Sequence, residues 1–315
     1  MIGTRVPRSS SFDPSHPSNS ISVIIPVYNG AKFIGRTLDS VLAQTVRPGE
    51  VIVVNDGSTD DSAAIVERYG DPVTLINVKN GGAGAARNLG AARAKGNWLA
   101  FCDADDLWLP HKLEKQLRLG GECPDVHCVL TDFTEMTDGV LSKRTHFSYA
   151  PQDFWAQEHY SQGFVVRQPV TGKLTTFQPS ITSTPIVKRD FYLSVGGFDV
   201  EATNSAEDTC FHFRLLSAVP FGVVPEVLMH YRRHPDSWSA DSVKQLQNSV
   251  IVWDYIIAKY PQAQPYRAKL LDGLASMRKE VGETESYQRR QKLKRFLGLG
   301  FSAGLGRAWK RRLHS

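Results

Sequence analysis

The sequence is poor in cysteine and lacks long apolar runs, which disfavours a disulfide-rich secreted protein and a membrane-spanning one. Its 315 residues contain four cysteines, Cys102, Cys123, Cys128 and Cys210, none with Cys-x-x-Cys spacing. We therefore expect buried, reduced thiols in a cytoplasmic protein. No run of 18 apolar residues occurs, so no transmembrane helix is expected. Residues 1–20 are rich in Ser and Pro without an apolar segment, which predicts a disordered leader and not a signal peptide.

Acidic residues are absent from the end of the chain. From Ser286 onward there are nine Lys or Arg and no Asp or Glu, which leaves 28 of the 37 basic residues against 32 acidic ones elsewhere. A mildly acidic body does not support nucleic-acid binding. The basic stretches 289–297 and 307–312 flank an apolar segment that contains glycine. We hypothesise that this tail contacts the inner face of the cell membrane; the alternative is a solvated tail or a helix packed on the body.

Buried strands and helices alternate in the first third of the chain. Apolar runs predict strands at 21–27, 51–54, 73–78 and 98–102, with helices from Ile34 to Thr45, up to about Tyr69, and from Ala83 to about Lys95. This alternation predicts an α/β fold with a mostly parallel, doubly wound sheet. Further on we expect strands at 126–130, 181–187 and 223–229, helices at 207–217 and 242–260, an irregular excursion at 132–178 and a polar loop at 230–239.

The strand at 98–102 stops abruptly at three carboxylates, Asp103, Asp105 and Asp106. In an extended chain residues i and i+2 point the same way, so Asp103 and Asp105 are expected to project together from the carboxyl end of the strand. That edge of an open α/β sheet is where ligands bind. A divalent cation that also holds phosphate oxygens would relieve the repulsion between the two acids. The alternative is a polar loop that caps the next helix.

Four segments resemble the family-2 glycosyltransferases. They are residues 22–29 (SVIIPVYN), 53–60 (VVNDGSTD), 86–90 (ARNLG) running on to 103–106 (DADD), and 196–199 (GGFD) followed by Glu207-Asp208. The match spans roughly residues 20–235. The resemblance implies a GT-A, Rossmann-like fold and an inverting enzyme that uses a nucleotide-sugar donor. It also implies a catalytic domain at 21–239, with a nucleotide-binding half of about 21–131 and an acceptor half of about 132–239, before a helical C-terminal extension with a basic tail at 240–315.

The resemblance also implies roles for individual residues. Asp56 would pair with the nucleotide base, usually uracil, although an Asx-turn without a ligand is the alternative. Asp105 and His234 would bind Mg²⁺ or Mn²⁺, although His234 could equally lie in a solvated loop. The other residues expected to contact the nucleotide sugar are Pro26, Tyr28, Asn29, Arg87, Asn88, Asp103 and Ala104.

The chemistry is expected at Glu207 and Asp208. Inversion takes a single displacement, in which the acceptor hydroxyl loses its proton as it attacks, so a carboxylate base is required near the acceptor. The resemblance assigns this role to Asp208, with Glu207 in support or in contact with the acceptor. Acidic residues are also favourable at a helix N-terminus, and this effect is compatible with the role.

These features predict transfer of a single sugar to a glycan or lipid-linked acceptor in cell-surface glycan assembly. The QxxRW motif and membrane helices of processive synthases in the family are absent from the sequence. A dehydrogenase is disfavoured because Arg87 replaces the third glycine of a dinucleotide fingerprint that begins at Gly82. A sugar nucleotidyltransferase would need a Gly-rich, basic loop after the first strand, which Tyr28-Asn29-Gly30 does not supply. A non-catalytic module that binds sugar nucleotides is the remaining alternative.

Overall fold

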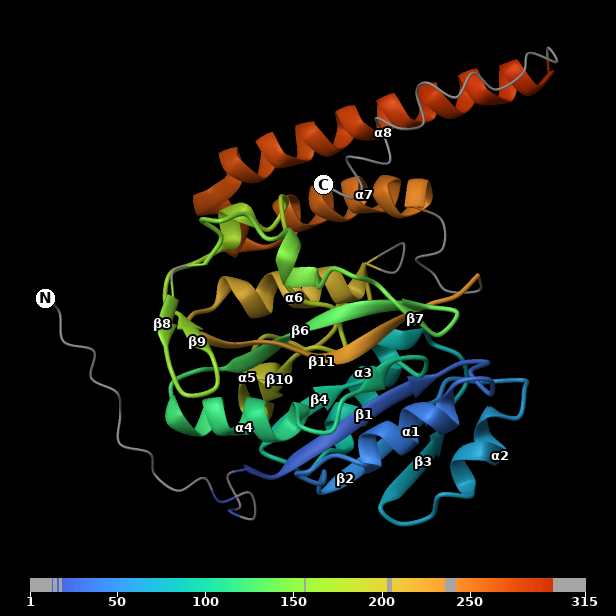
Figure 1. Ribbon diagram of the computed structural model, residues 1–315, viewed down its shortest axis with the longest axis vertical. Coiled ribbons are helices and arrows are strands. Elements are labelled where there is room, and N and C mark those ends of the chain that lie inside the picture. Colours follow the sequence, from blue (N-terminus) through green and yellow to red (C-terminus); the bar gives the residue numbers. More distant parts are fainter. Residues whose placement is uncertain are drawn as a thin grey trace, which may run out of the picture.

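The computed structural model describes residues 13, 16, 19–155, 157–202, 206–235 and 242–296. The chain forms one mixed sheet with helices on both faces (Figure 1). The strands are β1 (Ile21–Val27), β2 (Glu50–Asn55), β3 (Val73–Asn77), β4 (Trp98–Phe101), β5 (Leu107–Trp108), β6 (Cys128–Thr137), β7 (Val140–Leu141), β8 (Gln157–His159), β9 (Phe164–Val166), β10 (Ile186–Lys188) and β11 (Phe221–Arg233). The α-helices are α1 (Ile34–Leu42), α2 (Ser62–Glu67), α3 (Ala83–Arg93), α4 (Lys112–Glu122), α5 (Arg189–Ser194), α6 (Glu207–Ser217), α7 (Ser242–Lys259) and α8 (Arg267–Phe296). Short 3₁₀ helices lie at His146–Tyr149, Thr171–Lys173 and Pro261–Tyr266.

The sheet order is β3-β2-β1-β4-β10-β6-β11-β9-β8. Strands β3, β2, β1 and β4 are parallel, and β10 runs antiparallel between β4 and β6. The parallel half is the predicted doubly wound unit, because right-handed crossovers place each helix on a face of the sheet. The carboxyl ends of β1, β2 and β4 therefore meet at one edge.

Two hydrophobic clusters lie on opposite faces of the sheet. One joins Ile24 and Phe101 to α3, α6 and α7, and the other joins Val23 and Ile25 to α1 and α4. Successive strand residues point to opposite faces, so β1 contributes to both clusters and all seven of its residues are buried. This explains why its sequence is a nearly unbroken apolar run.

The second half of the chain is more regular than the sequence predicted. The expected strand at 126–130 continues to Thr137, and the expected excursion at 132–178 contains β7, β8 and β9. The predicted polar loop from His230 was also wrong in its start, because β11 continues to Arg233 and pairs with β6 as far as Thr137. His230 to Arg233 are only half-buried, so polar side chains are compatible with this end of the strand. The strand predicted at 181–187 is confined to Ile186–Lys188.

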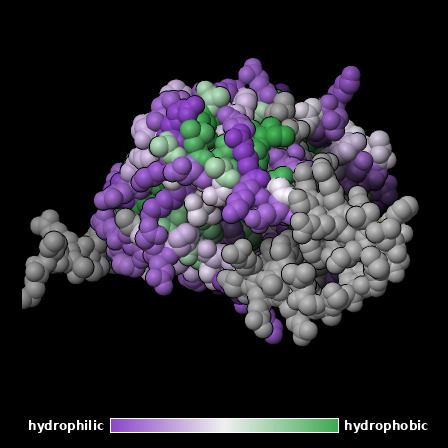
Figure 2. Space-filling model, turned by 90° about the horizontal axis from the view of Figure 1, so that it is seen from above, coloured by the Kyte–Doolittle hydropathy of each residue, from purple (hydrophilic) through white to green (hydrophobic). Residues whose placement is uncertain are grey.

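The helices α7 and α8 lie above α6 in Figure 1, and α8 extends beyond the body of the molecule. Trp253, Ile256, Ile257, Leu270 and Leu274 are buried in the same cluster as the sheet, so α7 and the start of α8 share its core. Figure 2 looks down on this side and shows a largely hydrophilic face with one hydrophobic area.

Further predictions concern the cysteines and the two ends of the chain. All four cysteines are free and buried, as predicted. Most of the leader and all of residues 297–315 lie outside the described residues, so the expectations for them stay predictions. Among the helices that are described, none combines the length and the apolarity needed to cross a bilayer.

Candidate active site

The three carboxylates after β4 are gathered by a turn. Strand β4 ends at Phe101, and the Asp106 N–H donates to the Asp103 carbonyl at 3.1 Å. The expectation of an extended chain through Asp105 was therefore wrong, although the acids still lie close enough to interact. Asp105 Oδ2 lies 3.0 Å from His234 Nε2, across 129 residues of sequence. Asp106 is fully buried and accepts hydrogen bonds from Ser183 Oγ at 2.5 Å and the Arg232 N–H at 3.1 Å.

Charge is crowded in this turn. Burial and the neighbouring Asp103 carboxylate raise the pKa of Asp105, against the opposing effect of His234. Burial and Asp105 raise the pKa of Asp106 well above its ordinary value. A cation near Asp105 would lower the energy of these carboxylates. Within the described residues, no group of three or more His, Cys, Asp or Glu side chains is placed to hold a metal. The predicted ligands Asp105 and His234 are only two side chains, so a divalent ion at this place would need further ligands from a bound diphosphate or from water.

Arg87 of α3 connects this turn to a second pair of acids. Its Nη2 lies 2.7 Å from Asp103 Oδ1, and its Nη1 lies 3.4 Å from Glu207 Oε1. The guanidinium also lies over the Phe198 ring, 5.0 Å from its centroid. Burial alone would lower the pKa of Arg87, but the carboxylates outweigh this effect and raise it. A buried, permanently charged arginine thus joins the turn after β4 to the start of α6, which lie about 100 residues apart in the sequence.

Asp208 lies beside Glu207 in the first turn of α6. Its carboxylate accepts the Thr209 N–H. Burial, and next the charge of Glu207, raise the pKa of Asp208 to about 6, although Arg87 and Thr209 act in the opposite direction. A half-buried carboxylate with a pKa near 6 is ionised at neutral pH and basic enough to take a proton. Glu207 approaches α3 so closely that a Cβ on Gly84 would lie 2.8 Å from its Cγ.

Asp56 lies at the end of β2 and is 3% exposed. Its two carboxylate oxygens accept the N–H groups of Gly81 at 2.7 Å and Gly82 at 2.8 Å. Asp56 therefore orders the loop that leads into α3. Because each carboxylate oxygen can accept a second hydrogen bond, these contacts leave acceptor capacity for a ligand.

The loop after β1 is tied to the loop after β2. Asn29 has a φ of +50°, and its side chain accepts the Thr59 N–H at 2.8 Å. Tyr28 is 56% exposed at this edge, whereas Pro26 is buried within β1. Ala104 directs its carbonyl to Thr37 Oγ1 at 2.8 Å. Of these predicted donor contacts, Tyr28 thus has the exposed ring surface that a base could cover.

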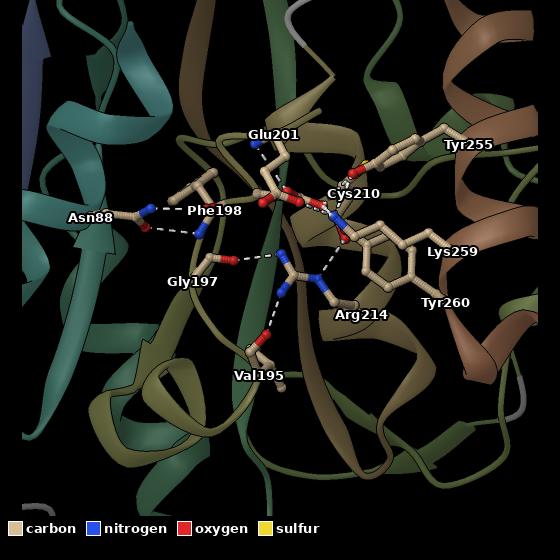
Figure 3. A network of polar contacts seen from close by, with 11 residues as sticks. Asn88, Val195, Gly197, Phe198, Glu201, Cys210, Arg214, Tyr255, Lys259 and Tyr260 are labelled. Atoms are coloured by element: carbon tan, nitrogen blue, oxygen red, sulfur yellow. Dashed lines mark hydrogen bonds and ion pairs between the residues drawn. The ribbon is translucent and has the colours of Figure 1, made fainter. Parts of the chain in front are cut away.

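Asn88 is occupied by contacts within the protein. Its Nδ2 donates to the Phe198 carbonyl at 2.8 Å, and its Oδ1 accepts the Phe198 N–H at 2.8 Å (Figure 3). The same Oδ1 accepts the Tyr192 hydroxyl at 2.6 Å. These bonds fix the turn at Gly196-Gly197. The side chain that the sequence assigned to the donor pocket is therefore engaged with the loop that precedes α6.

Sequence reasoning missed several residues that shape the site. Ser183 donates to Asp106 and also accepts the Asp103 N–H at 3.0 Å. Phe33 packs against the His234 ring, with centroids 4.6 Å apart, and under the Arg232 guanidinium at 5.1 Å. His212 is buried in α6, and burial followed by the charge of Arg87 lowers its pKa to about 3. Their sequence neighbourhoods carry no local signal, because each acts through a partner distant in the chain.

The comparison with protein families agrees with this geometry. The model for glycosyl transferase family 2 matches residues 22–180, about half of the chain. The chain belongs to this family. It is therefore a glycosyltransferase, and its first 180 residues carry the strands and loops that gather Asp56, Arg87 and Asp103–Asp106.

Known proteins extend the likeness beyond the matched segment. An uncharacterized glycosyltransferase of Rickettsia typhi is 29% identical over 277 residues, which cover 85% of this chain and 82% of that protein. The structure of TarS 1–349 of S. aureus in complex with UDP-GlcNAc has a TM-score of 0.60 at 21% identity, covering 81% of this chain and 71% of that one. The mannosyltransferase PcManGT of Pyrobaculum calidifontis, in complex with GDP-Man and Mn²⁺, has a TM-score of 0.55 at 20% identity, covering 90% and 82%. The family-2 enzyme described here thus has the GT-A fold.

Proposed function

We propose that this family member catalyses inverting, metal-dependent transfer of a single sugar from a UDP-sugar to a hydroxyl group of a glycan or lipid-linked acceptor. The observation that carries the proposal is the link made by Arg87. This residue contacts Asp103, next to the predicted metal ligand Asp105, and Glu207, next to the predicted base Asp208. The predicted nucleotide-binding and acid–base groups therefore belong to one continuous polar network.

The reaction follows from the chemistry of these groups. Asp208 accepts the proton of the acceptor hydroxyl as the oxygen forms its bond to the anomeric carbon. The bond from that carbon to the diphosphate breaks on the opposite face, so the configuration inverts and a nucleoside diphosphate leaves. A divalent ion held by Asp105 and His234 would offset the charge of the leaving diphosphate. Arg87 keeps Asp103 and Glu207 in place while this charge develops.

The donor is expected to lie along the loops after β1, β2 and β4. Asp56 is the predicted partner of the base, through the acceptor capacity that Gly81 and Gly82 leave, and Tyr28 offers an exposed ring for its face. The solved relatives with UDP-GlcNAc and with GDP-Man support a nucleotide-sugar donor. A UDP-sugar is proposed because the Asp56 motif resembles the uracil-binding motif of the family. The role in cell-surface glycan assembly is part of the same proposal.

A thermal-shift screen tests the donor. UDP-, GDP- and dTDP-sugars are added to the full chain with and without Mn²⁺, and a UDP-sugar is expected to raise the Tm most, and more with Mn²⁺.

Release of the nucleoside diphosphate is then measured for the wild type, Asp208→Asn, and a control variant at an exposed carboxylate, Asp61→Asn. Binding without turnover would support a non-catalytic module. Equal turnover by the wild type and Asp208→Asn would refute the proposed base.

A further inference from the structure

The turn that precedes α6 is held from two sides, by a residue of α3 and by a residue of α6. Gly196 and Gly197 have φ values of +81° and +63°, which favour glycine. Asn88 of α3 binds both backbone groups of Phe198. From the other side Arg214 of α6 donates to the carbonyls of Val195 and Gly197, the latter at 2.5 Å (Figure 3). The turn is therefore fixed between the helix that carries Arg87 and the helix that carries Asp208.

A third set of contacts comes from the C-terminal helices. Asp199 Oδ2 accepts hydrogen bonds from Lys259 Nζ at 2.9 Å, from the Tyr255 hydroxyl at 3.1 Å and from the Tyr260 hydroxyl. The Asp199 side chain is 10% exposed. Burial alone would raise the pKa of Asp199, but the hydrogen bonds from Tyr260, Lys259 and Tyr255 lower it to about 2. The carboxylate is thus ionised and closely held by groups from α7 and its end.

Asp199 also borders the site. It lines a cleft of about 230 Å³ together with Glu207 and with Gly81 to Ala85, which lead into and begin α3. It lies eight positions before Glu207 in the chain. Asp199 therefore contacts α7 through its carboxylate and lines the same cleft as Glu207.

We propose that Asp199 is a positioning residue through which α7 sets the place of Glu207 and Asp208. The inference rests on the proposed function, because it gives those two acids a geometry that transfer requires. The packing of α7 does not depend on Asp199, since Trp253, Ile256 and Ile257 anchor the helix in the core. Loss of the Asp199 contacts therefore loosens the turn that Arg214 joins to α6, and leaves the fold in place. The loops expected to bind the donor are held by Asp56 and Asn29 through hydrogen bonds that do not involve Asp199.

The test compares Asp199→Asn and Lys259→Met with a matched control, Glu201→Gln. Glu201 also accepts from Lys259, at 3.2 Å, but its side chain is 81% exposed, so its loss leaves the Asp199 contacts intact. Steady-state kinetics are measured with the donor established for the wild type. Small misplacements of acid–base groups are costly, so we expect Asp199→Asn to lower kcat by roughly 10- to 100-fold. The donor KM should stay within about twofold, because uniform binding is unaffected.

The pH profile separates positioning from simple loss of folded protein. The groups that act on Asp208 are Glu207, Arg87 and Thr209. When this turn is loosened, Asp208 becomes more exposed to water. The acidic limb of the pH profile of kcat/KM should therefore move to lower pH in Asp199→Asn and Lys259→Met. The fraction of folded protein, followed by far-UV circular dichroism, should not change. If both variants matched Glu201→Gln in kcat and in pH profile, the inference would be overturned.

The two proposals fail in different ways. If the wild type neither transfers nor hydrolyses any nucleotide sugar, the proposed function fails. If the wild type is active and the variants at Asp199 and Lys259 are equally active, only the positioning role fails. A fall in donor affinity with unchanged kcat would likewise overturn it, since it would place the effect on binding.

Discussion

Replacing Asp208 with Asn should stabilise the protein while it greatly slows the proposed reaction. The pKa of Asp208 is about 6, against an ordinary value of 3.8. The carboxylate is therefore harder to ionise in the folded chain than in the unfolded chain, and the difference corresponds to roughly 3 kcal/mol. Because Asp208 is only half-buried, water screens part of this penalty, and a gain of roughly 1–3 kcal/mol is the reasonable range. Asn keeps the oxygen that accepts the Thr209 N–H.

The size of the effect depends on pH. Below pH 3.8 the carboxyl is protonated in both states, and it imposes no penalty. Between pH 3.8 and 6 the unfolded chain ionises first, so the wild type loses stability relative to the variant as the pH rises. Above pH 6 the full penalty is present. The advantage of Asp208→Asn should therefore be largest at pH 8 and fall below roughly 1 kcal/mol at pH 4.

Urea denaturation of the ligand-free protein in EDTA measures this difference at both pH values, with Asp61→Asn as the exposed control. Asp208→Asn should also lose roughly 10²- to 10⁴-fold in transfer rate, the usual contribution of a general base. The wild-type kcat/KM should rise with pH through an apparent pKa near 6. A variant no more stable than the wild type at pH 8, or a difference independent of pH, would refute the view that burial makes Asp208 a better base.

Three further predictions concern the rest of the site and the tail. Arg87→Gln should destabilise the fold by roughly 2–4 kcal/mol, because two half-buried carboxylates lose their partner; urea denaturation measures the loss, and a neutral effect would contradict the bridging role. Asp105→Asn and His234→Ala should each reduce the extra Tm shift that Mn²⁺ adds to a UDP-sugar, with the shift from nucleotide alone retained; an unchanged Mn²⁺ effect would remove them as ligands. The full chain should co-sediment with anionic liposomes more than a chain that ends at Ser286; equal binding would discard the membrane role of the tail.

Much of the parallel half of the sheet could be predicted from its sequence. β1, β2 and β4 are buried on both faces, so they must be continuous apolar runs, and each ends where turn-forming or acidic residues begin. Parallel pairing brings these ends to one edge, which gathers the segments that begin at Asp56 and Asp103. The burial of Cys102 and Cys128 followed from the same logic, since both lie in apolar runs.

Only the tertiary structure decided which side chains meet across that edge. Arg87 contacts Glu207 over 120 residues, and Asp105 contacts His234 over 129. Asn88, expected at the donor, fixes Phe198, and Asp199 joins the turn before α6 to Lys259 of α7. Periodicity in a sequence records which face of an element is buried, but not which distant element covers it. The apolar pattern therefore determined the strands and their edge, whereas the packing of α6, α7 and the end of β11 determined how the acids there are paired and how strongly they hold their protons.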